Sequence, residues 1–274
     1  MTSLHAAFWI LIGICVVTWV ISLVTREYSW VDRIWSMVPV AYVWVFAVGG
    51  GTVGARALLM AVLVTLWGAR LTFNFARKGG YARGGEDYRW AHLRAQMSAP
   101  LFQIFNLLFI VCYQNVLLFL IALPAYTAAT HPRGLTVLDW VLAAAFVAAL
   151  VGETVADQQQ WRFQQWKKAE RAAGREPGIR FVQTGLFRYS RHPNFFFEQS
   201  QWWLLFFFGC VAAGSLWQWT VIGPALLIAL FLGSTRFTEQ ISLERYPEYA
   251  EYQARVSALV PWFRRSREDL AQLR

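Results

Sequence analysis

The stretch Gly185–Glu198 brings together residue types that bind an anion. It reads GLFRYSRHPNFFFE and holds two arginines, a histidine and an asparagine just before an apolar run. Its glycine permits a tight turn and its proline suits the first turn of a helix, so the positive end of that helix would follow the basic residues. Guanidinium groups beside a helix N-terminus bind phosphate strongly. The histidine would either cap the helix or bind phosphate. The candidate ligands are Arg188, Arg191, His192 and Asn194.

Polar side chains also lie inside apolar stretches, where a charged group costs about 2.5–3.5 kcal/mol at the centre of a membrane helix. Arg70 and Asn74 are four residues apart, as are Asn194 and Glu198, so each pair shares a helix face. Single residues of this kind can be simple hydrogen-bonded contacts between helices. Because most of them, including Glu153, fall toward the same end of their helices, the pattern favours a polar cavity that opens at that end.

The segment Asp157–Lys168 follows an apolar block and is rich in helix-forming residues, so we expect it to continue that helix. Asp157, Gln160 and Lys168 would lie along one stripe of the extension. The stripe is either a solvated face on the membrane surface or a donor-rich wall for a polar ligand such as a nucleotide.

No sequence pattern for a metal or for a nucleophilic catalyst is present. The four histidines are scattered, and neither a Gly-rich phosphate loop nor a Ser/His/Asp signature occurs. Cys15, Cys112 and Cys210 all fall in apolar stretches, where they would be small buried hydrophobic residues. We therefore predict no metal site and no disulfide.

The elements that must position these residues are apolar helices. Hydrophobic residues make up 57% of the 274 residues and charged residues 15%, against roughly 25% charged in a soluble domain. The apolar residues form blocks of about 20, the length that crosses a hydrocarbon core of about 30 Å as a helix. The blocks are continuous rather than alternating, which favours an all-α fold over a barrel. The seven predicted spans are about Ala6–Val24, Ile34–Gly50, Ala57–Phe75, Leu101–Leu123 (ended by Pro124), Val137–Ala156, Phe195–Ala213 and Leu216–Thr235.

The distribution of basic residues sets the orientation. If the N-terminus lies outside, the inside segments hold 22 of the 25 Lys and Arg residues, and the outside loops hold only Arg56 and Arg133. This is a strong positive-inside signal and places the C-terminus in the cytoplasm. The net charge of +9 then reflects contact with anionic membrane lipids rather than with nucleic acid.

At the stretch GLFRYSRHPNFFFE the sequence resembles the NADPH-binding turn of the steroid 5α-reductase-like family of membrane proteins, and in particular its bacterial branch. Four further segments are similar to marks of that branch, and together they touch most of the chain. They are Asp32–Trp35, Gly85–Trp90, Glu244–Tyr249 and Leu259–Trp262. The C-terminal half is also similar to isoprenylcysteine and phospholipid methyltransferases.

The resemblance implies a seven-helix fold that binds NADPH in a cavity facing the cytoplasm, in a bacterial inner membrane. Residues 1–124 would form the pocket for a lipophilic small-molecule substrate, and residues 125–274 would bind the cofactor. A hydride would pass to the carbon–carbon double bond of a steroid-like or isoprenoid-like enone. The implied cofactor ligands are Asp157, Gln160, Lys167, Arg180, Arg188, Tyr189, Arg191, His192, Asn194, Glu198, Tyr249 and Tyr252.

One departure from the family concerns the group that polarises the substrate carbonyl. The steroid enzymes use a Gln-Glu pair in the second helix and a tyrosine in the third, whereas the matching stretches here, Trp35–Pro39 and Trp67–Arg70, hold neither. Reduction of an enone needs a hydrogen-bond donor at that oxygen, because negative charge develops there. We expect Arg70, or Glu86 or Tyr88 from the following loop, to serve as the catalytic group.

Two other functions remain open at the level of sequence. A membrane methyltransferase would bind S-adenosylmethionine, which has no phosphates, so the excess of Arg and Lys around the turn favours a dinucleotide. A transporter or assembly factor would show broken spans and repeated halves, and the sequence indicates neither.

Overall fold

The computed structural model describes residues 2–49, 51 and 53–264, which contain helices but no β-strand. Five helices in this part of the chain are long and apolar enough to cross a membrane. The chain is therefore an all-α polytopic membrane protein, as the sequence predicts. The five candidate spans are Ser3–Thr25, Ala55–Arg77, Ala99–Thr130, Val137–Ala172 and Trp219–Arg245.

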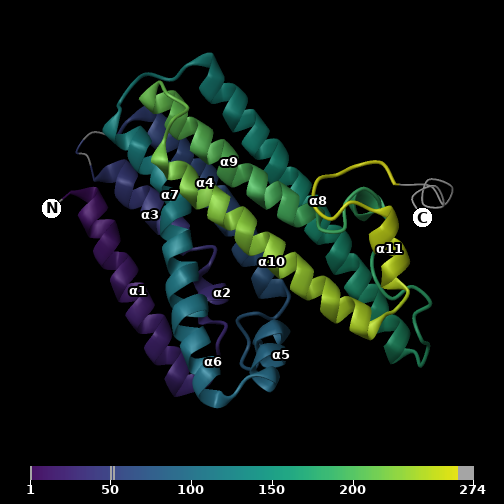
Figure 1. Cartoon of the computed structure of the whole chain (residues 1–274). Coiled ribbons are helices and arrows are strands. Elements are labelled where there is room, and N and C mark those ends of the chain that lie inside the picture. The colour runs from purple at the N-terminus through teal and green to yellow at the C-terminus, as the bar shows by residue number, and fades with distance from the viewer. Residues whose placement is uncertain (1, 50, 52, 265–274) are drawn as a thin grey trace. The chain divides into compact units, whose positions relative to one another are not determined.

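The chain divides into two compact units; Figure 1 shows the helices coloured along the chain. Unit 1 comprises Met1–Phe146 and Trp202–Leu227, and unit 2 comprises Val147–Gln201 and Ile228–Arg274. All three points at which the chain passes from one unit to the other lie within helices. This division differs from the predicted one at residue 124, because the end of one late helix and the start of the next belong with the N-terminal helices.

Unit 1 is built around α7 (Gln114–Thr130), which lies against α1, α3 and α4. Its interior contains large apolar side chains such as Tyr42, Phe46 and Trp67, each with no exposed surface. Its other helices are α1 (Ser3–Thr25), α2 (Trp30–Ile34), α3 (Val38–Val48), α4 (Ala55–Arg77), α5 (Tyr88–Gln96), α6 (Ala99–Phe105), the π-helix η1 (Asn106–Tyr113) and the 3₁₀ turn η3 (Trp219–Val221).

The second predicted span is broken. The apolar block expected over Ile34–Gly50 contains the end of α2, a turn at residues 35–37, and α3, which has only 11 residues; Gly50 itself lies outside the described residues. Such a helix is about 16 Å long and does not cross a core of about 30 Å. Pro39 lies in the first turn of α3, and the restriction that proline places on the preceding backbone favours a helix start there.

The prediction that Pro124 ends the fourth span is wrong. Pro124 lies inside α7, which continues to Thr130. Proline cannot donate a hydrogen bond to the Leu120 carbonyl one turn earlier. Gly223 packs its backbone against that carbonyl, since a Cβ added there would lie 2.5 Å from the Leu120 oxygen. The helix that contains Gly223 therefore packs closely against this span beside the proline.

A π-helix in the same span sets the direction of two buried asparagines. Asn106 donates to Ser22 Oγ at 3.0 Å, and Asn115 donates to Thr18 Oγ1 at 3.3 Å, so both face α1. Nine residues of an α-helix rotate a side chain by about half a turn beyond full turns, which would place the two asparagines on opposite faces. The wider turn of η1 between them brings both to the same face.

A buried ion pair joins α4 to the start of α8. Arg56 donates from Nε and Nη2 to the two carboxylate oxygens of Asp139, at 2.6 and 2.9 Å. Asp139 also accepts from the backbone and hydroxyl of Thr136. The two charged side chains are 2% and 0% exposed. Arg56, which the sequence presents as a loop charge, is thus a contact between helices.

Unit 2 contains the rest of the two long helices α8 (Val137–Ala172) and α10 (Ile222–Arg245), the start of α9 (Pro193–Ala213) and the short α11 (Tyr249–Arg255). The predicted helical extension of the fifth span is confirmed, because α8 runs without a break to Ala172. The seventh block also extends, since α10 continues ten residues beyond the predicted end at Thr235.

Candidate functional site

The turn that precedes α9 is held against α8. Gly185 opens the 3₁₀ turn η2 (Gly185–Arg188) with a positive φ of 62°. The next residue, Leu186, donates its backbone N–H to Gln159 Oε1 at 2.9 Å. A Cβ at Gly185 would lie 2.5 Å from this glutamine side chain. The positive φ therefore favours glycine here, and a larger residue would also displace the Gln159 amide from Leu186.

The same turn is paired with the segment that follows α11. Ser190 and Ser257 form a parallel bridge, and the hydroxyl of Tyr252 donates to the Phe187 carbonyl at 2.5 Å. Further hydrogen bonds of this pairing include Arg191 N to Ser257 O, His192 N to Ala258 O, Ser190 Oγ to Leu259 O and Trp262 N to Tyr189 O. The C-terminal motif that ends in Pro261 and Trp262 thus acts with the basic turn as one structure.

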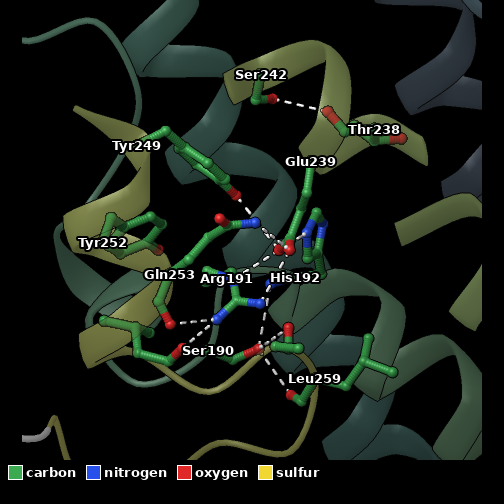
Figure 2. Close-up of polar contacts among 12 residues, drawn as sticks. Ser190, Arg191, His192, Thr238, Glu239, Ser242, Tyr249, Tyr252, Gln253 and Leu259 are labelled. Atoms are coloured by element: carbon green, nitrogen blue, oxygen red, sulfur yellow. Dashed lines mark hydrogen bonds and ion pairs between the residues drawn. The ribbon is translucent and has the colours of Figure 1, made fainter. Parts of the chain in front are cut away.

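Glu239 on α10 is the centre of this structure (Figure 2). Its oxygens accept two hydrogen bonds from Arg191, at 2.6 and 2.9 Å, and one from Gln253 at 2.8 Å. His192 Nε2 lies 2.9 Å from Oε1, and the Tyr249 hydroxyl donates to the same oxygen at 3.4 Å. Sequence reasoning missed Glu239; its only local signal is an acidic residue where an apolar helix continues past its expected end.

Two phenols in this cluster are shielded from water. Tyr249 and Tyr252 are 6% and 4% exposed, and Phe181 packs against both rings. Burial raises the pKa of Tyr249 and of Tyr252 above the ordinary value of a phenol, and the charge of Glu239 raises the pKa of Tyr249 further. Both hydroxyls are therefore held neutral and act as hydrogen-bond donors.

Two more of the predicted cofactor ligands contact the protein itself. Lys167 donates to the Arg180 carbonyl at 2.6 Å, and its ammonium lies 5.6 and 5.3 Å from the ring centres of Phe163 and Tyr246. Arg180 lies 3.6 Å from Glu248, and both of these side chains are half exposed. The ligand roles predicted for Lys167, Arg180, Arg191, His192, Tyr249 and Tyr252 stay predictions, but each of these side chains also has a structural partner.

Arg188 differs from Arg191 although both belong to the basic turn. The side chain of Arg188 is exposed and has no ion-pair partner among the described residues, and the neighbouring Tyr189 is 40% exposed. Arg188 is consequently the guanidinium of this turn that is accessible to an external anion.

Behind the turn, α8 and α9 carry matching polar residues along facing sides. The two helices run in opposite directions (Figure 1), and Gln201 donates to Glu153 Oε2 at 2.7 Å. Both helices repeat polar residues at intervals of four and three, which returns them to one face. Counting from this bond places Asp157 level with Glu198, and Gln160 level with Asn194. We call these six residues the polar ladder of unit 2: Glu153, Asp157, Gln160, Asn194, Glu198 and Gln201.

Several buried atoms of unit 2, two of them in the ladder, lack a hydrogen-bond partner within the described part of the chain. They come from all three long helices of unit 2 and include both donors and acceptors. Leaving such an atom unpaired costs about 1–3 kcal/mol, so a polar ligand in this interior would be stabilised by them. These atoms are Gln160 Oε1, Gln199 Nε2, Gln201 Oε1 and Thr235 Oγ1.

The three predicted catalytic residues all belong to unit 1. Arg70 lies in α4 and is half-buried. Glu86 accepts the backbone N–H of Tyr28 at 2.8 Å and lies 3.5 Å from Arg94. Tyr88 is the first residue of α5 and is 55% exposed. The carboxylate of Glu86 thus holds the loop before α5 against the segment that contains Tyr28. The catalytic roles of the three residues stay predictions.

Two of the sequence marks form one structure in unit 1. Trp90 donates to Asp32 at 2.7 Å, and the backbone of Asp87 donates to Ser29 Oγ at 2.9 Å. Arg33 donates to the Gly80 carbonyl at 3.2 Å. The segments around Asp32 and Gly85 therefore hold the loop before α5 against α2. No group of residues suited to a metal ion occurs in the part of the chain that the structure describes.

Fold and site together define a polytopic α-helical membrane protein whose second unit has a polar interior beside a basic turn. The chain belongs to the DUF1295 family, described as "Protein of unknown function", whose model matches residues 18–256. It is 39% identical over 260 residues to "Uncharacterized protein C594.04c" of Schizosaccharomyces pombe, covering 89% of this chain and 76% of the relative. No solved structure matches the chain. Since this relative is fungal, the bacterial membrane stays a prediction.

Proposed function

We propose that the chain is a membrane-embedded reductase that binds NADPH in unit 2 and reduces the carbon–carbon double bond of a lipophilic enone. The observation that carries the proposal is the polar ladder, which contains buried unpartnered amide oxygens in the same unit as the accessible Arg188. The resemblance of the basic turn to that of steroid 5α-reductase-like proteins supports the same assignment. An intramembrane set of polar residues of this kind is costly and marks a functional site.

The residues of unit 2 fit the chemical groups of the cofactor. Arg188 and the N-terminus of α9 would hold phosphate. The buried carboxylates Asp157 and Glu198 would accept hydrogen bonds from ribose hydroxyls, and the amides of Gln160 and Asn194 would take both donors and acceptors. NADPH supplies the hydride when it is bound.

The substrate carbonyl also needs a group that stabilises its developing negative charge. Arg70 is the strongest of the three candidates, because Glu86 already accepts a backbone hydrogen bond and lies beside Arg94. A guanidinium stays protonated at any physiological pH and would donate to the carbonyl oxygen as negative charge develops. Arg70→Lys should then retain more activity than Arg70→Met.

One observation favours a methyltransferase instead. Arg191 donates hydrogen bonds to Glu239, and Lys167 donates to a backbone carbonyl. Fewer cations are therefore available to bind phosphate than the sequence suggests. The acidic side of the ladder would suit the sulfonium cation of S-adenosylmethionine. Binding measurements separate the two cofactors directly.

The test is a thermal-shift titration of the detergent-purified protein with NADPH, NADH and S-adenosylmethionine. A ligand that binds the native state at 100 times its Kd stabilises it by about 2.7 kcal/mol. We expect NADPH to raise the unfolding temperature, and we expect Asn194→Ala and Glu198→Ala to remove this rise. Gln240→Ala, an exposed change on α10, should leave it intact. Stabilisation by S-adenosylmethionine alone would overturn the proposal.

A further inference from the structure

The deepest residues of the polar ladder, Glu153 and Gln201, were not assigned a role by the sequence. Glu153 is 2% exposed and Gln201 has no exposed surface. The Gln201 amide nitrogen donates to Glu153 Oε2 at 2.7 Å and to the Phe197 carbonyl at 3.2 Å. Its oxygen, Oε1, has no partner among the described residues.

The orientation of this amide follows from its neighbours. The Phe197 carbonyl only accepts hydrogen bonds, so the side of the Gln201 amide that faces it must be the nitrogen. Glu153 in its ionised form requires the same orientation. Gln201 is thus held with its oxygen turned away from both partners, as a fixed acceptor without a donor.

The position of this acceptor relates it to the basic turn. Gln201 follows Asn194 by seven residues, which returns it to the same face of α9 about 10 Å further along the helix. A ligand whose phosphates are held by Arg188 and the start of α9 would therefore reach Gln201 with its other end. That end must carry an N–H or O–H group and must be small enough to enter a helical interior.

We propose that Gln201 accepts a hydrogen bond from the carboxamide N–H of the nicotinamide ring, and that Glu153 is a positioning residue that fixes the Gln201 amide. This inference rests on the proposed function, because it assigns one contact of the same cofactor. Binding to an apolar ring edge or to a ring without a donor would leave Gln201 Oε1 unpaired.

The test uses NADP⁺ and its 3-acetylpyridine analogue, in which a methyl group replaces the carboxamide nitrogen. Dissociation constants are measured by thermal shift and by quenching of tryptophan fluorescence, with no catalytic turnover. The wild-type protein should bind the analogue about tenfold more weakly, the ratio expected when one buried hydrogen bond is lost. Gln201→Met should bind both nucleotides with equal affinity.

Three further variants complete the test. Glu153→Leu removes the acceptor that fixes the Gln201 nitrogen and should weaken the discrimination against the analogue. The conservative Glu153→Gln should restore it, and the exposed Gln240→Ala is the control that should leave it unchanged. If Gln201→Met does not fold, the wild-type ratio decides, because equal affinity for the two nucleotides would overturn the assignment. Failure of the wild-type protein to bind NADP⁺ at all would instead overturn the proposed function together with this inference. If Gln201→Met still bound NADP⁺ more tightly than the analogue, the acceptor of the carboxamide N–H would be another residue, and the assignment to Gln201 would be overturned.

Discussion

In unit 1, Arg56 donates to both oxygens of Asp139, and in unit 2, Arg191 donates to both oxygens of Glu239. The first pair is almost fully buried, and its carboxylate is otherwise bonded to Thr136, three residues away. The second is 11% and 8% exposed. Its carboxylate is shared with three other side chains, from the basic turn and from the segment that follows α10.

The difference between the pairs shows that one guanidinium–carboxylate contact can serve two purposes. The Arg56 pair connects two membrane helices and buries both charges. The Arg191 pair gathers the basic turn, α10 and α11 around one carboxylate, next to the accessible Arg188. We therefore expect loss of the first pair to affect stability alone, and loss of the second to affect both stability and nucleotide binding.

The largest effect is expected for Asp139→Asn. This change leaves the buried Arg56 without a counter-charge, which costs about 3–5 kcal/mol when a buried pair is broken. The free energy of unfolding, measured by denaturant titration in detergent, should fall by that amount while the NADPH affinity of the folded fraction stays unchanged. Arg133→Met, at an exposed position, is the control. A loss no larger than that of the control would show that the pair is not structural.

Glu239→Gln should have the next largest effect. It removes the charge opposite Arg191 but keeps the size of the side chain, and the slight exposure of the pair reduces the penalty to about 2 kcal/mol. Because the basic turn would loosen, NADPH should also bind at least tenfold more weakly. Glu248→Gln, which alters the exposed pair with Arg180, should change neither quantity appreciably. Unchanged binding in Glu239→Gln would remove the contrast between the two pairs.

The sequence predicts the positions of the helices well, because the length and hydrophobicity of each apolar block are enough to indicate a membrane helix. A helix lies at each of the seven blocks, and the fold class is confirmed. The points at which a helix ends or continues are harder to predict from the sequence. Pro124 lies within its helix, and Gly223, about a hundred residues later, packs against the carbonyl that the proline frees. Such a long-range contact leaves no periodic signal near the proline.

The site is predicted only in part for the same reason. The ladder residues Asp157, Gln160, Asn194 and Glu198 are found by their polarity within apolar helices. Glu239, by contrast, matters through partners about 48 residues away in the turn and 14 residues away in α11. Nothing near Arg191 or Arg188 distinguishes the engaged guanidinium from the accessible one, because that distinction depends on Glu239.

Alkaline pH should have a smaller effect on stability, through the two buried phenols of the Glu239 cluster. The folded-state pKa of Tyr249 and of Tyr252 is raised, so the unfolded chain ionises first, near pH 10. Their contribution is complete below pH 10 and is lost as the pH rises toward the folded-state pKa, by up to about 1.4 kcal/mol for each phenol at pH 11. The unfolding temperature of the wild-type protein should fall between pH 9 and pH 11. Tyr249→Phe should show a shallower fall, and identical slopes would contradict the prediction.

The smallest effect is expected for Tyr252→Phe at neutral pH. The substitution keeps the aromatic ring between Phe181 and Tyr249 but leaves the Phe187 carbonyl without its donor. One neutral hydrogen bond contributes about 1 kcal/mol, so the free energy of unfolding should fall by that amount. Tyr249→Phe should cost less, since its hydroxyl lies 3.4 Å from Glu239, which already has four shorter polar contacts. If Tyr249→Phe proved the more harmful of the two, the Tyr249 hydroxyl would be an important donor to the Glu239 carboxylate, and the prediction would be wrong.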